Sequence, residues 1–356
     1  MSRFVDGRVT AVSGMGADGN DLAMNVNRQT SDLLPPSDGL GAAPRTVLTA
    51  RQLRALGVTP AVLAERSRTG GPWRQVLPQV YLLHPGAPSG EERVRAALLY
   101  AGQHTRAGGP AALVTGPAAL ALHHFGAVVA PAGPPVIDVL VPHQRRLRDA
   151  GDVRIHRVRE LPRPHDVGGL PCAPVARALA DTVAGLDDTE AVRRLLTEAV
   201  RRGHCDPVSV LRELSAAGLL ERPCVAAALP ALRAAGRRTA EQRLYTMARC
   251  GQLPDPAWNV DLRLPGGPPL GAVDAFWPEH GVAVVVDARI GAADDAAEWD
   301  RCVRLREQLE ALGVTVVHLT LAKLRDALDQ QATVVRTALV ASADRTPAAY
   351  LVVTPR

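Results

Sequence analysis

The sequence predicts a multidomain α/β protein, and three observations support this prediction. The chain has 356 residues, of which 47% are hydrophobic, enough for two or three domains with cores of their own. Segments with helically spaced apolar residues alternate with short apolar runs typical of buried strands. Glycine and proline residues separate these segments. We therefore expect several domains that combine helices with sheets.

The N-terminal part predicts a leader and a small helical module. Residues 1–44 are rich in Gly, Ser, Asp, Asn and Pro without periodicity, so we expect a disordered leader there. Residues 45–88 contain two short helices, the second opened by Thr59 and Pro60, and two short strands around Pro78. Two helices followed by a hairpin predict a winged helix-turn-helix domain.

Residues 89–236 predict a mixed α/β middle domain. The expected helices cover 91–102, 116–125, 174–183, 188–202 and 207–217, and the expected strands cover 136–141 and 153–158. The turn between these two strands, residues 143–148, is basic. We expect the two strands to pair with each other.

Residues 237–343 predict a third domain, followed by a tail at 344–356. Its expected helices cover 237–249, 296–312 and 321–341, and its expected strands cover 258–264, 272–276, 282–287 and 314–319. The apolar runs in the last two strands are long enough to be covered on both sides. The pattern therefore predicts an α/β/α arrangement with a sheet buried on both faces.

Charge and cysteine usage limit the possible functions. Residues 239–356 hold 12 basic and 15 acidic residues, a net −3, so the remainder carries +8 within a total of +5. A basic N-terminal part favours phosphate contacts, whereas an acidic C-terminal part repels DNA. The five cysteines form no C-x-x-C pair and no apolar run is long enough to span a membrane, which predicts a cytoplasmic protein with reduced thiols.

The arginines of the N-terminal module predict a DNA-binding surface. Between residues 45 and 74 the chain has six arginines and one acid, Glu65. We predict DNA contacts from five of these arginines: Arg51, Arg54, Arg66, Arg68 and Arg74. Arg66 and Arg68 are expected on the recognition helix and Arg74 on the wing. The alternative is a solvated surface used for protein contacts.

The C-terminal domain contains the frame of a metal-dependent nuclease. Asp274 and Asp287 lie on neighbouring predicted strands, and two carboxylates of this kind can hold Mg²⁺ with several waters. Val285 stands where a further carboxylate is expected, and the single lysine, Lys323, lies well beyond that strand. We therefore expect a vestigial site. The alternative is that the two aspartates only end strands and cap turns.

The segment from Val47 to His84, with Leu-Thr-Ala-Arg-Gln-Leu-Arg-Ala-Leu-Gly and Trp-Arg-Gln-Val-Leu-Pro-Gln-Val-Tyr-Leu-Leu, resembles the winged-helix domain of AbiEi-type antitoxins of type IV toxin–antitoxin systems. The middle segments 116–124 and 169–181 are similar to actinobacterial members, so the likeness covers about residues 45–215. The resemblance implies a transcriptional repressor of its own operon. Where relatives have glycine before Val-Tyr this chain has Gln79, which we expect to alter the tight turn.

The C-terminal part resembles the very-short-patch-repair-endonuclease-like domain of the restriction-endonuclease-like fold. The resemblance carries over to Glu241, Asp274 and Asp287, whereas the central Glu is replaced by Val285 and the following Gly by Ala288. A histidine usual in relatives is absent from residues 291–294. The resemblance thus implies a degenerate nuclease domain, with metal ligation limited to Asp274 and Asp287.

The combined prediction is a DNA-binding transcriptional regulator that needs no cofactor. Its expected partners are double-stranded DNA from its own promoter region and a cognate toxin, with two or more copies needed for a full interface. The first alternative is a Mg²⁺-dependent DNA endonuclease with an altered site at Glu241, Asp274 and Asp287. The second is an interaction module that neutralises a toxin through the middle domain.

Overall fold

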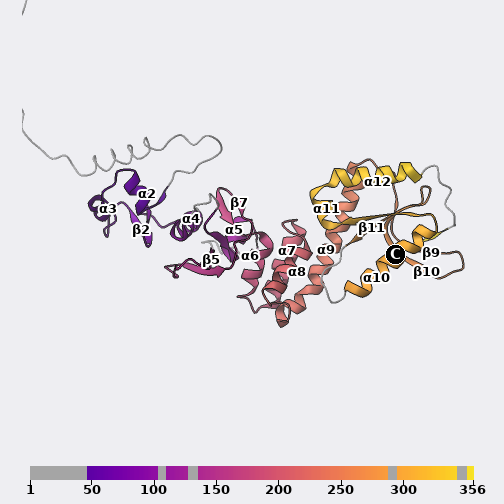
Figure 1. Ribbon diagram of the computed structural model, residues 1–356, viewed down its shortest axis with the longest axis horizontal. Helices are drawn as coiled ribbons and strands as arrows, with labels where there is room; N and C mark the ends of the chain where they lie inside the picture. The colour runs from indigo at the N-terminus through magenta and orange to yellow at the C-terminus, as the bar shows by residue number, and fades with distance from the viewer. Residues whose placement is uncertain (1–45, 103–109, 127–134, 288–294, 343–350) are drawn as a thin grey trace, which may run out of the picture. The chain divides into compact units, whose positions relative to one another are not determined.

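The computed structural model describes residues 46–102, 110–126, 135–287, 295–342 and 351–356 (Figure 1). The predicted leader and residues 344–350 of the predicted tail lie outside this description. The chain divides into two compact units, Met1–Ala87 and Pro88–Arg356. The described part is a mixed α/β protein with three sheets.

The first unit is a small α/β module whose helices are fixed by their caps. Its elements are β1 (Val47–Thr49), α2 (Ala50–Ala55), α3 (Pro60–Arg66), β2 (Arg74–Leu77) and β3 (Val80–Leu82), with the sheet in the order β1-β3-β2. Thr49 and Gln52 form a capping box at the start of α2, and Thr59 caps α3. Leu53, Leu63 and Trp73 belong to one buried apolar cluster. The module therefore has a core of its own.

The middle part of the second unit contains a five-stranded sheet in the order β6-β5-β4-β8-β7. Its strands are β4 (Leu113–Thr115), β5 (Ile137–Pro142), β6 (Val153–Val158), β7 (His165–Val167) and β8 (Leu170–Cys172). Helices α4 (Gly90–Ala101), α5 (Gly116–Leu122) and α6 (Val175–Val183) contact the sheet. The predicted pairing of residues 136–141 with 153–158 is confirmed, and the pair is parallel.

The connection between β5 and β6 runs back along the outer edge of β6. Because β5 and β6 are parallel, the connection between them has to run back along the whole length of the six-residue strand, which is about 20 Å. Residues 143–152 cover that distance, with turns at both ends, and we call them the return loop. His143 N continues the β5–β6 ladder by donating to Val158 O at 2.8 Å. On the outer edge, Ala150 and Val153 exchange backbone hydrogen bonds, and Ile155 N donates to Asp149 Oδ1 at 2.8 Å. The chain itself therefore covers the first half of the β6 edge.

Three helices connect the two sheets of the second unit. They are α7 (Thr189–Arg201), α8 (Pro207–Ala216) and α9 (Pro223–Cys250), and α7 and α8 lie beside α9 (Figure 1). The domain boundary predicted at 236/237 falls inside α9. Pro223 occupies the first turn and Pro230 lies within the helix, which continues to Cys250.

The C-terminal part contains a five-stranded sheet in the order β12-β11-β10-β9-β13. Its strands are β9 (Ala257–Arg263), β10 (Pro269–Trp277), β11 (Val282–Asp287), β12 (Thr315–Thr320) and β13 (Val352–Pro355), and its helices are α10 (Asp295–Ala311), α11 (Leu321–Asp326) and α12 (Leu328–Ser342). β11 and β12 are parallel, on either side of α10 in the chain. Val284 and Val286 pack with one apolar cluster and Val285 with another, so β11 is covered on both faces.

An ion pair connects the middle part with the C-terminal part. Asp206 caps α8 by accepting a hydrogen bond from Ser209 N at 2.8 Å. Its second oxygen, Oδ2, lies 3.4 Å from Nη1 of Arg325 on α11. Both side chains are mostly buried, since they are 16% and 27% exposed.

A bilayer-spanning helix is not found in the described parts of the chain, where none of the helices combines the required length and hydrophobicity.

Candidate functional site

The first unit exposes most of the arginines that the sequence singled out. Arg51 and Arg54 are exposed on α2, and Arg74 is exposed at the start of β2. Arg68 lies beyond the end of α3, with 71% of its side chain exposed and Glu65 Oε1 at 3.9 Å. An ion pair so long and so exposed contributes little to stability. These four guanidinium groups are therefore available to an external anion.

Arg66 has a different environment. Its guanidinium carbon lies 4.9 Å from the ring centre of Trp73, which is 3% exposed. Trp73 N also donates to Arg66 O at 3.0 Å. Arg66 thus fastens the end of α3 to the strand pair through a cation–π contact and a backbone bond. This contact joins residues seven positions apart and depends on the fold, so no pattern in the sequence indicates it.

The hairpin turn between β2 and β3 contains a strained residue. Leu77 pairs with Val80, which leaves Pro78 and Gln79 as the two turn residues. Gln79 has φ of 62°, a left-handed conformation that favours glycine. Gln79 O accepts a hydrogen bond from Ala50 N at 2.9 Å, which connects the turn to α2. The turn therefore keeps the left-handed conformation although the side chain is not that of glycine.

Asp274 and Glu241 approach each other in the C-terminal part. Asp274 Oδ2 accepts a hydrogen bond from Val286 N on the neighbouring strand at 2.6 Å. Burial raises the pKa of Asp274 above its usual value and the charge of Glu241 adds to this, while the Val286 N–H, Arg237 and Arg356 oppose it. Glu241 lies on α9 and Asp274 on β10, so the fold brings together two residues that are 33 positions apart.

Position 285 carries no ligand and lies in an apolar environment. Val285 packs with the cluster that contains Leu262, Leu309 and Val314. The main chain of Asp287 ends β11 opposite Thr320, and its side chain lies outside the description, as do Ala288 and residues 291–294. Within the described residues no three His, Cys, Asp or Glu side chains are grouped as metal ligands.

The described residues fit a paired carboxylate better than a Mg²⁺ site. Arg237 and Arg356 both lower the pKa of Asp274, so they stabilise the negative charge that a cation would otherwise neutralise. Val286 N–H occupies one carboxylate oxygen. Asp274 therefore also has the structural role of bonding β10 to β11.

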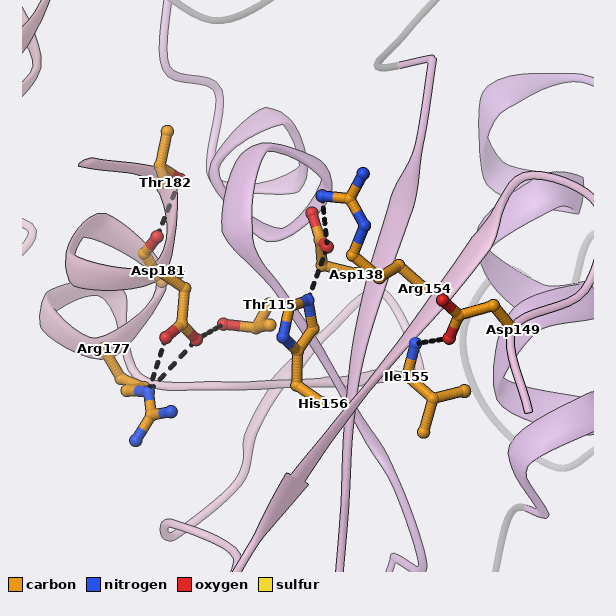
Figure 2. Close-up of polar contacts among 10 residues, drawn as sticks. Thr115, Asp138, Asp149, Arg154, Ile155, His156, Arg177, Asp181 and Thr182 are labelled. Atoms are coloured by element: carbon orange, nitrogen blue, oxygen red, sulfur yellow. Dashed lines mark hydrogen bonds and ion pairs between the residues drawn. The ribbon is translucent and has the colours of Figure 1, made fainter. Parts of the chain in front are cut away.

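A polar network on the middle sheet was not predicted from the sequence. Thr115 Oγ1 donates to Asp181 Oδ2 at 2.5 Å, and Arg177 Nε donates to both oxygens of Asp181 at 2.9 and 3.0 Å (Figure 2). On the next strand, Asp138 Oδ1 lies 2.7 Å from His156 Nε2, and this hydrogen bond raises the pKa of His156. The only signal in the sequence is the Arg177–Asp181 spacing of four residues on one helix.

Two further histidines form a partly buried pair. His123, after α5, and His204, after α7, have ring centres 6.2 Å apart, and His204 stacks on Phe125 at 4.9 Å. Nε2 of each ring is buried without a hydrogen-bond partner in the described structure. Burial lowers the pKa of both, so the neutral forms are favoured.

Comparison with known proteins finds no match: no family model matches the sequence, and no curated protein matches it.

Proposed function

We propose that the chain is a DNA-binding transcriptional regulator whose first unit is a winged helix-turn-helix module. The observation that supports this most strongly is the exposure of Arg51, Arg54, Arg68 and Arg74 on a module with only Glu65 as a nearby acid in the segment. Two helices followed by a hairpin suit the geometry in which the second helix enters the major groove.

In the proposed complex, α3 contacts the bases, and the arginines around it contact the phosphate backbone. The exposed side of α3 carries Ala61, Val62 and Ala64, which are small enough to allow close approach to base edges and thymine methyl groups. The exposed arginines lie on α2, after α3 and on β2, where they suit the phosphate backbone on either side of the groove. Arg66 supports this surface by fixing α3 to Trp73.

The proposed mechanism is occupancy of the chain's own promoter region. This follows the resemblance of residues 45–215 to AbiEi-type antitoxins, and it makes a cognate toxin a proposed partner. The C-terminal part is proposed to be a restriction-endonuclease-like domain that no longer cleaves DNA. Val285 in its apolar cluster and the arginines around Asp274 support this part of the proposal.

A gel-shift experiment with the native upstream DNA tests the proposal. The wild-type chain should shift this fragment at lower concentration than an unrelated duplex of equal length. The variant with Arg51→Gln, Arg54→Gln and Arg74→Gln should abolish the shift, because each charge-assisted phosphate contact is removed while the core stays intact. Arg66→Ala is a poor test, since it also removes the contact with Trp73. Absence of any shift by the wild type at low salt would reject the proposal.

The proximity of Glu241 and Asp274 favours a second function, Mg²⁺-dependent DNA cleavage. Incubation of supercoiled plasmid with the protein and Mg²⁺ or Mn²⁺ separates the two functions. Nicking by the wild type that disappears in Asp274→Asn would support the nuclease. Equal and negligible nicking by both proteins is the result that we expect.

A further inference from the structure

The return loop and β6 together form an arginine-rich edge of the middle sheet, which the proposed function of the first unit does not use. Residues 143–160 contain six arginines and three acids. Asp149 caps Ile155 N, and Asp152 pairs with Arg93 at 2.6 Å, so two of the three acids are already bonded. Residues 143–160 therefore carry a net positive charge, and most of their charged side chains that have no bonding partner are arginines.

Two of these arginines hold the loop in place. Arg157 on β6 donates from Nε to Arg145 O at 3.2 Å and from Nη2 to Leu147 O. Arg145 in turn donates to Ala101 O at the end of α4. Tyr100 Oη donates to Arg148 O at 2.9 Å. These bonds hold the loop to β6 and α4 with a fixed main-chain path.

Three other arginines are presented from this fixed path. Arg146, Arg148 and Arg159 are exposed, and within the described residues no acid or carbonyl oxygen bonds to their guanidinium groups. His143 N donates to Val158 O, and Arg157 Nε donates to Arg145 O, so residues 143–145 lie close to residues 157–158. Arg146 directly follows the first of these segments, and Arg159 directly follows the second. We call these three residues the basic ridge.

We propose that the basic ridge is a second contact surface for the phosphate backbone of duplex DNA. This inference rests on the proposed function and adds the middle part of the chain to the DNA interface. Arg146 and Arg148 are two residues apart, at most about 7 Å of chain, and Arg159 lies near the same end of the loop as Arg146. One DNA strand presents a phosphate about every 3.4 Å along its axis, so neighbouring phosphates match this spacing.

The composition of the surface distinguishes DNA from a protein partner. Protein interfaces contain apolar or aromatic anchors at their centre, whereas phosphate interfaces are polar and strongly positive. The large exposed hydrophobic residues found in the described structure are Val62, Val208, Tyr245, Val334, Val340 and Val352, and none belongs to residues 143–160. Addition of a partner strand is also hindered, because Ala150 and Asp149 of the return loop already bond to the outer edge of β6 at Val153 and Ile155.

Salt-dependent binding of the full chain tests the basic ridge. The ridge variant carries Arg146→Gln, Arg148→Gln and Arg159→Gln. A control variant carries Arg201→Gln, Arg212→Gln and Arg249→Gln, which removes the same charge from exposed positions of α7, α8 and α9. Binding of the native upstream duplex is measured by fluorescence anisotropy from about 50 to about 300 mM salt, the range in which phosphate contacts are resolved.

The slope of log K against log salt should decrease by about 1 for each phosphate contact that is removed, so by up to about 3 in the ridge variant. The control variant should retain the wild-type slope. Equal slopes in the ridge variant and the wild type would overturn the inference while leaving the proposed function intact. No binding by the wild type would reject the proposed function itself. A ridge variant that binds DNA normally but fails to bind a protein partner would also overturn the inference.

Discussion

Gln79 occupies a backbone conformation that costs a side-chain-bearing residue free energy. Its φ of 62° places the β-carbon close to its own carbonyl, a cost of roughly 1–2 kcal/mol that glycine avoids. Glycine avoids this cost, but it loses more conformational entropy on folding, which offsets part of the gain.

Gln79→Gly should therefore stabilise the first unit by about 0.5–1 kcal/mol. Native-state hydrogen exchange of the amides in residues 47–82 measures this as a higher free energy of opening. Gln75→Gly, in β2, serves as the control and should lower that free energy, since glycine weakens a strand. A Gln79→Gly variant that opens more easily would contradict the role of backbone strain.

The raised pKa of Asp274, a partly buried carboxyl group, predicts how the stability of the fold depends on pH. Burial raises its pKa in the folded chain above the ordinary 3.8, so the ionised form destabilises the fold once the pH exceeds that value. Asp274→Asn keeps an oxygen for Val286 N but has no charge. The variant should be as stable as wild type below pH about 3.8 and more stable at pH 7.

Urea unfolding between about pH 3 and pH 7, on either side of the ordinary carboxyl range, gives the difference in free energy directly. A variant that is less stable than wild type at neutral pH would show that Arg237 and Arg356 outweigh the cost of burial. Glu279→Gln, on an exposed turn, is the matched control and should leave the profile unchanged.

The sequence identified individual residues better than their partners. It selected Glu241 and Asp274, which the fold brings together, and it selected Arg66 but not its partner Trp73. Asp138 and Asp181 were missed because each is a single acid among apolar neighbours in the chain. Their network exists only where β4, β5 and α6 meet.

Elements were predictable where their pattern was long. The strands at 153–158 and 282–287 were predicted with the observed bounds, and α7 and α8 within two residues at each end. β1, β4, β7 and β8 have three residues each, which is too short to show alternation. The predicted final helix is two helices, α11 and α12, because Ala327 leaves the helical conformation with φ of −144°.

The contact between the end of α5 and the loop after α7 should respond to pH. His123 and His204 have lowered pKa values, mainly through burial, so the unfolded chain binds their protons first as the pH falls. The second unit should therefore become less stable as the pH falls below about 6.5, down to the lowered pKa values.

His204→Gln should reduce this loss of stability at acid pH, because glutamine carries no charge at any pH. Thermal unfolding between about pH 5 and pH 7.5, which spans the ordinary histidine range, measures the loss, with His143→Gln, an exposed residue, as the control. His156 acts in the opposite direction: its raised pKa adds stability below about pH 6.5 that disappears as the pH rises through the folded value. A larger loss of stability at acid pH in His204→Gln would contradict the prediction.

The ion pair between Asp206 and Arg325 connects parts of the second unit that are distant in the chain. Arg325→Gln should destabilise this unit by about 1–2 kcal/mol, since it leaves a mostly buried carboxylate without its cation. Asp326→Asn removes the exposed neighbour of Arg325 and should cost less than about 0.5 kcal/mol.

A double-mutant cycle with Asp206→Asn isolates the pair. A coupling energy above about 0.5 kcal/mol is expected for residues in direct contact. A coupling near zero would mean that the two halves are held by the packing of α9 against α7, α11 and α12 alone.

The division of the chain into sheets followed from the alternation of helical and apolar segments, but the link between the sheets did not. The sequence placed a boundary at 236/237, and the protein has a continuous helix there. Gly236 is buried on α9, so it serves close packing rather than a break.

The packing of Val285 limits which substitutions the fold tolerates at this position. An acid introduced by a single codon change at this position would have to shed its hydration among Leu262, Leu309 and Val314. Such a substitution would impair folding unless the neighbouring side chains changed as well. A single substitution therefore cannot add a carboxylate to the covered face of β11 without loss of stability.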